Sequence, residues 1–314
     1  EASLLNNRLT VSADYYNRKT DDLLYGVNVS QTTGFASYTG NIGNMVNKGY
    51  ELLVSGDIIK KKDLTWNMSV SYSNNDNKIT SLYSDNVPNT LSRLKIGQPI
   101  NTFYLVRWAG INADNGKNQF YKADGSITDV YSASDAVLLE GKSPLVKYFG
   151  SVNTSLSYKG IDLSAQVYYS GGNYIMNYMW QNAASDGESF NNNQFVEAFN
   201  YWKKPGDKVQ YANPLDPSQN ITYTTDKYLQ KGDYITLRDV TLGYTLPASI
   251  VSKARIKGLR LFLQGTNLWL GTKFKGTPEV GQANSETTTP VQGQSTLYGY
   301  PPIKAMTLGV NVSF

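Results

Sequence analysis

Apolar and polar residues alternate along several segments of this chain, each about ten residues long. The residues between the apolar positions are mostly Ser, Asn, Thr and Gly. Successive side chains of a β-strand point to opposite faces, so each segment predicts a strand with one apolar and one polar face. The apolar positions are Leu9, Val11, Ala13 and Tyr15; Trp66, Met68, Val70 and Tyr72; Val152, Leu156 and Tyr158; Leu163, Ala165, Val167 and Tyr169; and Met306, Leu308, Val310, Val312 and Phe314. The pattern predicts an all-β fold.

The length of these strands separates two all-β architectures. Strands of globular proteins are usually about five or six residues long, whereas a tilted strand needs about 9–11 residues to cross a bilayer. The open edge of a sheet cannot be satisfied in lipid, so strands that cross a membrane close into a barrel. A soluble β-sandwich also shows alternation. Strand length and the tyrosines near strand ends favour an antiparallel transmembrane β-barrel, with apolar residues toward lipid and polar residues toward the lumen.

One predicted strand changes phase. In Tyr234–Leu246 the apolar residues occupy odd positions first and even positions later. A β-bulge near Arg238-Asp239 would restore a single apolar face. Alternatively, the apolar residues before Arg238 contact a plug or a loop inside the barrel.

The connections between the predicted strands differ in length. Lys60–Asp63 and Lys159-Gly160 are short, whereas Gly171–Tyr228 and Gly271–Pro302 are long. Outer-membrane barrels have short periplasmic turns and longer extracellular loops, which places the two long segments outside the cell. The segment Asn75–Lys147 breaks this simple alternation and is expected to supply one more strand, near Asn118–Lys122. We thus expect about ten or eleven strands.

The amino-acid composition excludes several kinds of metal binding and catalysis. The 314 residues include no cysteine and no histidine, which excludes disulfides, the usual zinc, haem and iron–sulfur ligand sets, and His-based catalysis. Asn112–Gly116 resembles a calcium loop only faintly and is interpreted as an ordinary turn. The net charge of +4 is too small to indicate nucleic-acid binding. We expect no enzyme activity, metal or cofactor.

The long segment Gly171–Tyr228 is rich in aromatic and amide side chains. Such side chains bind sugars or peptides through stacking and hydrogen bonds. The candidate contact residues are Tyr174, Tyr178, Trp180 and Trp202. The alternative is that these aromatic residues pack the loop against itself.

The chain ends on an aromatic residue of an alternating strand. Val310, Val312 and Phe314 lie at every second position of this strand. A terminal aromatic residue on such a strand is what the barrel-assembly machinery of outer membranes is known to favour. We therefore interpret the three residues as an assembly signal, and expect any missing sequence to precede Glu1.

Specific strings occur from one end of the chain to the other. They are Leu9–Leu24, Asn41–Glu51 (N-x-G-x-M-x-N-K-G-x-E), Lys147–Gly150 (K-Y-F-G), Ser157–Ser164, Trp202–Asp207, Gly232–Pro247, Thr266–Trp269, Lys273–Gly276, Pro278-Glu279 and Tyr300–Pro302. Together they resemble strings of SusC/RagA-type TonB-dependent outer-membrane transporters. The longest match, Gly232–Pro247, departs from the family pattern at Thr236 and Asp239.

The resemblance implies a function for which residues 1–314 would be one part. Members of this family are plugged barrels of 22 strands in the outer membrane of Bacteroidota, so this chain would be the C-terminal portion of such a barrel. A SusD-like surface lipoprotein closes over the barrel as a lid, and TonB energises the import of glycans or peptides. The plug and the TonB-contacting segment would lie in the N-terminal remainder. Tyr174, Tyr178, Trp180 and Trp202 would then contact cargo or lid. The alternatives are a small self-contained outer-membrane pore and a soluble β-rich glycan-binding module.

Overall fold

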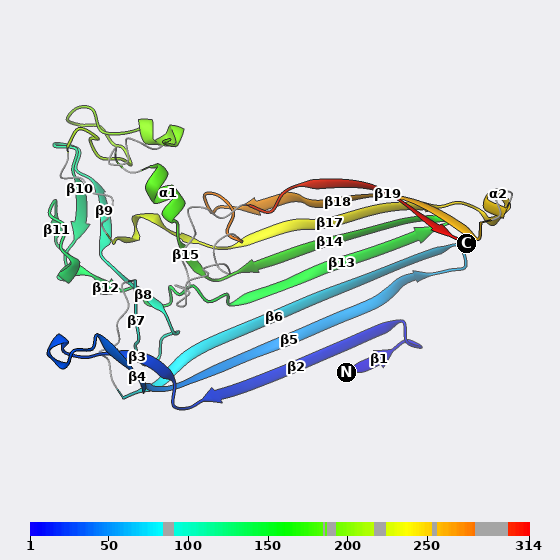
Figure 1. The fold of residues 1–314 in the computed structure, drawn as a ribbon, viewed down its shortest axis with the longest axis horizontal. Coiled ribbons are helices and arrows are strands. Elements are labelled where there is room, and N and C mark those ends of the chain that lie inside the picture. The colour runs from blue at the N-terminus through cyan, green and yellow to red at the C-terminus, as the bar shows by residue number, and fades with distance from the viewer. Residues whose placement is uncertain (84–90, 185, 187–192, 217–223, 253–255, 280–300) are drawn as a thin grey trace.

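A single large antiparallel sheet dominates the computed structural model, which describes residues 1–83, 91–184, 186, 193–216, 224–252, 256–279 and 301–314. Figure 1 shows its strands side by side in one twisted layer, in the order β1-β2-β5-β6-β13-β14-β17-β18-β19. The bounds are β1 Ala2–Leu4, β2 Leu9–Thr20, β5 Gly43–Lys60, β6 Leu64–Leu82, β13 Tyr148–Tyr158, β14 Ile161–Gly171, β17 Tyr234–Thr245, β18 Gly258–Thr272 and β19 Ala305–Ser313. The all-β prediction is confirmed.

The register of this sheet aligns the apolar positions of neighbouring strands into continuous rows. Three such rows are Val11, Val54, Val70, Val152, Val167, Leu237 and Trp269; Trp66, Leu156, Leu163, Leu242, Leu263 and Leu308; and Leu64, Tyr158, Ile161, Tyr244, Leu261 and Val310. Many of these side chains are exposed. A face this wide and this apolar exceeds what a monomeric soluble protein leaves in contact with water. We call it the apolar face and the opposite side the polar face.

Connections at the two ends of the sheet differ in length. Lys61–Asp63 and Lys159-Gly160 turn at one end, where the amide nitrogen of Lys159 donates to the carbonyl oxygen of Asp63 at 3.2 Å. The long connections 83–147 and 172–233 are at the other end (Figure 1). We call these ends the turn end and the loop end.

The strand expected near Asn118–Lys122 is not part of the large sheet. β10 (Asn118–Tyr121) instead pairs with β9 (Arg107–Ile111) and β11 (Ile127–Thr128) in a small separate sheet. Residues 83–147 therefore form one connection from β6 to β13, so the alternation of long and short connections holds along the whole chain. The prediction of about ten or eleven strands was wrong for the large sheet. Its described part has nine strands, of which β1 is only three residues long.

The phase change in β17 is a β-bulge, as one of the two interpretations predicted. Leu237 and Asp239 face consecutive residues of β14, Val167 and Gln166, so Arg238 is an extra residue. On the other side, β18 places two further residues, Asn267 and Leu268, opposite this point. Asn267 has a φ of +51°, a conformation that Asn tolerates better than most residues. The bulge keeps Leu237 and Val240 on the same face despite their odd spacing.

The loop end carries short elements that pack above the sheet. These are β3 Leu24–Asn28, η1 Gln31–Thr33, β4 Ser37–Asn41, β7 Ser92–Arg93, β8 Thr102–Leu105, η2 Ala133–Asp135, β12 Val137–Leu138, β15 Tyr174–Met176, α1 Tyr178–Ala183, η3 Val196–Phe199, η4 Asp226–Tyr228 and β16 Leu229–Lys231; α2, Ala248–Val251, lies at the turn end. Among the described residues, no helix is long and apolar enough to cross a membrane.

The main hydrophobic core also lies at the loop end. Its buried residues come from two long connections and are Leu91, Phe103, Leu105, Leu139, Met176 and Tyr228. We call the described parts of residues 83–147 and 172–233 the loop assembly. Because side chains from both connections share one core, the loop assembly folds as one packed unit at the loop end of the large sheet.

Candidate functional site

The polar face is lined by small polar side chains that bond to one another across strands. The hydroxyl groups of Ser71 and Ser151 lie 2.9 Å apart. Asp239 accepts from Gln264 Nε2 of the neighbouring strand at 2.6 Å, and from Thr241 Oγ1 of its own strand at 3.1 Å. A groove of about 330 Å³ runs over the middle of the sheet, lined by Asn67, Asn153, Thr154, Ser155, Ser164, Ala165, Gln166 and Asp239. The lining of this groove offers hydrogen-bonding groups and a single charged side chain, Asp239, which suits contact with neutral polar molecules.

A larger cleft of about 570 Å³ opens on the polar face where it meets the loop end. Its lining residues are Val146, Tyr168, Ser170, Asn173, Tyr234, Arg238, Pro278, Glu279 and Pro302, and we call it the Arg238 cleft. Ser170 and Tyr234 are directly paired across β14 and β17, which fixes their relative positions. The β-bulge supplies Arg238, whose guanidinium lies 4.9 Å from the ring centroid of Tyr168. The bulge therefore has two effects. It keeps the apolar residues of β17 on one face, and it contributes a cation to this cleft.

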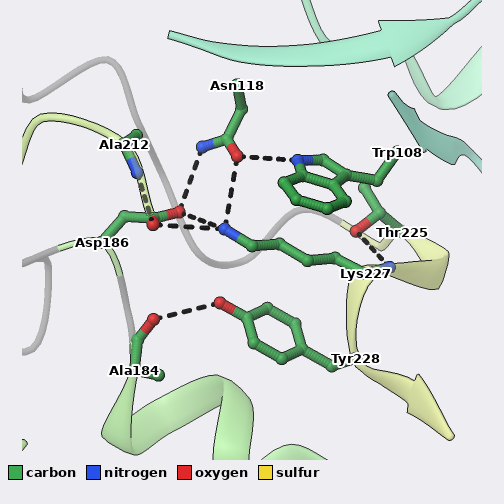
Figure 2. Close-up of polar contacts among 8 residues, drawn as sticks. All are labelled: Trp108, Asn118, Ala184, Asp186, Ala212, Thr225, Lys227 and Tyr228. Atoms are coloured by element: carbon green, nitrogen blue, oxygen red, sulfur yellow. Dashed lines mark hydrogen bonds and ion pairs between the residues drawn. The ribbon is translucent and has the colours of Figure 1, made fainter. Parts of the chain in front are cut away.

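A buried ion pair joins parts of the loop assembly (Figure 2). Lys227 Nζ lies 2.9 Å from Asp186 Oδ2 and 3.2 Å from Oδ1, and the two side chains are 8% and 5% exposed. Asn118 donates to Asp186 Oδ2 at 3.1 Å and accepts from Trp108 Nε1 at 2.9 Å. The amide nitrogen of Ala212 also donates to Asp186, at 2.9 Å. One carboxylate therefore joins four segments of the loop assembly.

Aromatic rings complete the surroundings of the lysine. Its Nζ lies 5.0 Å from the ring centroid of Trp108, 5.3 Å from that of Tyr211 and 5.4 Å from that of Tyr228. Burial lowers the pKa of Lys227, although the neighbouring carboxylate opposes this shift. Burial also raises the pKa of Tyr228, whose hydroxyl donates to the carbonyl oxygen of Ala184 at 3.1 Å. We call Trp108, Asn118, Asp186, Tyr211, Lys227 and Tyr228 the lysine cluster.

Three of the four aromatic residues proposed from the sequence lie together, against the main core. Tyr174, Tyr178 and Trp180 pack on its buried residues and remain half-buried. Trp180 also stacks on Phe195 with ring centroids 4.6 Å apart, and Lys275 Nζ lies 4.5 Å from its ring centroid. Burial raises the pKa of Tyr178. These contacts fit the alternative in which the aromatic residues pack the loop on itself, while leaving part of each ring exposed.

Trp202 lies apart from the other three, against the turn that follows β9. Its Nε1 donates to the carbonyl oxygen of Ala113 at 2.8 Å, and its ring covers Gly116, where a Cβ would lie 2.5 Å from ring atom Cε3. Trp202 is half-buried. Its contacts join residues 113–116 to the segment that follows η3, and its role in binding cargo or lid stays a prediction.

The turn at Asn112–Gly116 is held by amides rather than arranged for a metal ion. Asp129 accepts from Asn112 Nδ2 at 3.0 Å, Asn115 Nδ2 at 2.8 Å and Gln119 Nε2 at 2.9 Å. The Oδ1 atoms of Asn112 and Asn115 accept from backbone amides two residues on, so their NH₂ groups turn toward the carboxylate. Calcium requires oxygen ligands, and the described residues contain no cluster of acidic residues able to hold a metal.

The three residues proposed as an assembly signal lie at the turn end of the last strand. Val310 and Val312 are on the apolar face of β19, paired with Leu261 and Leu259. Phe314 follows the strand and is 83% exposed. No contact in the described residues bears on recognition of this strand, so the assembly role stays a prediction.

Residues 2–168, more than half of the chain, match the model of one protein family, described as TonB dependent receptor-like, beta-barrel. The chain belongs to the TonB-dependent receptor β-barrel family. This membership agrees with the resemblance noted from the sequence strings, and with the antiparallel sheet that has one apolar and one polar face.

Similar proteins of this family are known by sequence and by structure. The chain is 28% identical to TonB-dependent receptor P3 of Formosa agariphila, covering 100% of this chain and 33% of that protein. It is 28% identical to TonB-dependent receptor SusC of Bacteroides thetaiotaomicron, covering 88% and 28%. The solved structure of the RagAB peptide transporter matches with a TM-score of 0.82 and 28% identity, covering 98% and 34%. The chain spans about a third of the length of the curated relatives it matches.

Proposed function

We propose that this chain is part of the wall and extracellular loops of an outer-membrane transporter that imports oligosaccharides or peptides. In this proposal the apolar face contacts lipid, the polar face lines the lumen, and the loop end faces the outside of the cell. An N-terminal remainder of the barrel, including a plug, would complete the transporter. A SusD-like lipoprotein would cover the loop assembly, and TonB would supply the energy. The chain itself performs no catalysis in this scheme.

The observation that carries the proposal is the height of the apolar face between two sets of aromatic side chains. Tyr72, Tyr148 and Tyr169 lie toward the loop end, and Trp66, Tyr158 and Tyr244 toward the turn end. Tyr148 and Tyr158 are the first and last residues of β13. Ten steps of about 3.3 Å, at a tilt of about 40°, give a height of about 25 Å. That is the height of the apolar band of outer-membrane barrels, which aromatic girdles flank.

The cargo is proposed as an oligomer because the groove over the middle of the polar face offers mainly neutral hydrogen-bonding groups. The comparisons support transport of this kind in similar proteins, one of which is named a peptide transporter. A passive pore and a soluble binding module are the competing functions. A soluble module would leave the exposed apolar rows of the large sheet in water, which argues against that function.

Uptake by living cells tests the proposal. Cells that carry the intact transporter should accumulate fluorescently labelled oligosaccharides or peptides, and lose this uptake when either the transporter or TonB is disrupted. Uptake that persists without TonB would indicate a passive pore. Release of the protein from membranes by salt, without detergent, would contradict its place in the outer membrane.

A further inference from the structure

The Arg238 cleft contains two polar groups that no described residue satisfies. Asn173 is 1% exposed, and its Oδ1 atom has no hydrogen-bond partner; the buried Nε atom of Arg238 also has none. Buried polar atoms are nearly always paired, and each exception calls for an explanation. Both residues line the same cleft, so the explanation we consider is a ligand that could pair with one acceptor and one donor.

Asn173 is held rigidly at the rim of the cleft. The carbonyl oxygen of Asn173 accepts from the amide nitrogen of Gly232 at 3.0 Å. A Cβ at Gly232 would lie 2.7 Å from both terminal atoms of the Asn173 carboxamide, so the absence of a side chain there makes room for that group. Gly172, one residue before, donates its amide proton to Asp233 Oδ1 at 2.7 Å. The carboxamide is therefore ordered before any ligand arrives, which reduces the entropic cost of binding.

The charges of the cleft are already compensated. Arg238 forms an ion pair with Glu279, and the guanidinium covers the ring of Tyr168. The rings of Tyr168 and Tyr234 lie 6.0 Å apart between centroids, tilted by 42°. No uncompensated charge remains among the described lining residues to attract a peptide terminus or an acidic ligand. The cleft also lies on the face of the sheet rather than at a strand edge, so a peptide could not bind there by adding a strand.

We propose that the Arg238 cleft binds one sugar unit of a neutral oligosaccharide. A sugar hydroxyl both donates and accepts, so neighbouring hydroxyls can donate to Asn173 Oδ1 and accept from Arg238 Nε. The tyrosine rings provide apolar surface for the C–H groups of the sugar, as aromatic residues with a polar tip do at wet interfaces. The volume of about 570 Å³ lies within the range of small-molecule sites, roughly 300–1,000 Å³. This inference rests on the proposed function and narrows its cargo to glycans.

Binding by the purified, intact transporter complex tests the assignment. The probes are an array of neutral hexasaccharides of glucose, mannose, galactose and xylose in α- and β-linked forms, and a matched array of hexapeptides. We expect binding to at least one glycan. The affinity for that glycan should fall about tenfold or more in Asn173→Ala and in Arg238→Lys, since each variant leaves a ligand group unpaired. Asn17→Ala, an exposed position on β2, should bind as the unaltered protein does.

Two results would overturn the inference. One is binding to peptides and to no glycan. The other is glycan binding that is unchanged in Asn173→Ala while heat-dependent electrophoretic mobility shows a normally folded barrel. Both results leave the transport proposal standing if uptake still requires TonB. Conversely, glycan binding that depends on Asn173, in a protein whose uptake does not require TonB, would support the site and contradict active transport.

Discussion

Lys227 and Asp186 form an ion pair that is almost wholly removed from water, with 2.9 Å between Nζ and Oδ2. Both residues come from the same long connection, but the groups around them also come from the connection between β6 and β13. Taking two charges out of water is costly, so the pair is weak evidence for added stability. We expect it instead to favour one arrangement of the two connections over others.

Removal of one partner should harm the loop assembly more than removal of both. Lys227→Met leaves Asp186 charged and buried, at a cost of about 3–5 kcal/mol. In Lys227→Met combined with Asp186→Leu no buried charge remains, and most of that loss should be recovered. Protease sensitivity of the loop assembly and thermal unfolding of the four proteins measure this coupling. A double variant at least as unstable as the sum of the single variants would contradict it.

Gly150 should not accept a side chain. A Cβ there would clash with the carbonyl oxygen of Ser71 and lie 2.5 Å from the hydroxyl oxygen of Tyr169, which itself donates to Ser71 O at 3.1 Å. Gly150→Ala should therefore destabilise the wall by about 1–3 kcal/mol. The matched control is Gly26→Ala on β3, where a Cβ meets nothing within 4 Å. Unfolding in urea from detergent micelles measures both; equal effects would contradict the expectation.

Acid should loosen the turn around Asp129. Burial raises the pKa of this carboxyl, but hydrogen bonds from three amides outweigh burial and hold the pKa below its ordinary value of 3.8. Because the pKa in the folded state is the lower one, the stabilisation is complete above about pH 4. It is lost as pH falls through the folded pKa. Amide exchange of residues 107–130, corrected for the intrinsic rate, should show protection lost in that range. In Asp129→Asn the protection should not change with pH there.

The ends of the sheet should lie on opposite sides of the membrane. Residues 1–314 include no cysteine, so a cysteine introduced among them reports its own location when the remainder of the transporter is also free of cysteine. A cysteine at Lys61, in the turn between β5 and β6, should be shielded from an impermeant maleimide in intact cells and react after lysis. A cysteine at Val130, which is 71% exposed in the loop assembly, should react in intact cells. The reverse labelling pattern would contradict the proposed orientation of the sheet in the membrane.

Strand β19 should influence assembly of the barrel, if Phe314 acts as the proposed assembly signal. In Phe314→Ser the aromatic residue that follows β19 is lost while the pairing of β19 with β18 is unaffected, since Phe314 lies beyond the strand. We expect less protein in the outer membrane at equal synthesis, measured by membrane fractionation. Phe199→Ser is a matched control, because Phe199 is also an exposed phenylalanine but lies in the loop assembly. Equal membrane levels of both variants would contradict an assembly role.

The large sheet was predictable because apolar and polar residues alternate regularly along its strands. Alternation identified the strands and their faces, and the phase change near Arg238 located a bulge that the pairing confirms. The structure explains particular residues in two of the family strings. Gly150 ends the string K-Y-F-G and lies beneath Tyr169, whereas Asn267 in the string T-N-L-W supplies the positive φ at the bulge.

The loop assembly was not predictable, because its contacts have no period. Asp186 and Lys227 are single charges 41 residues apart, and isolated charges in a loop are ordinarily solvated. Nothing local distinguishes them from exposed residues. β10 was misplaced for a related reason: four residues of strand cannot be assigned to a wall or to a loop sheet by alternation alone. The Arg238 cleft was also missed, since its residues come from five separate segments.

Strands β5 and β6 are longer than crossing a bilayer requires. β6 has 19 residues, and its part beyond Asn74 adds eight more residues above the row of Tyr72. At about 3.3 Å per residue and a tilt of about 40°, this part rises roughly 20 Å above the lipid, with Asn47, Asn75 and Asn77 joined by side-chain hydrogen bonds. Residues 97–100 cover one face of this extension, where Asn77 and Ile79 are buried, and the other face is then in water outside the cell. It presents antibodies or phages with a rigid epitope, whose shape is set by backbone pairing rather than by loop conformation.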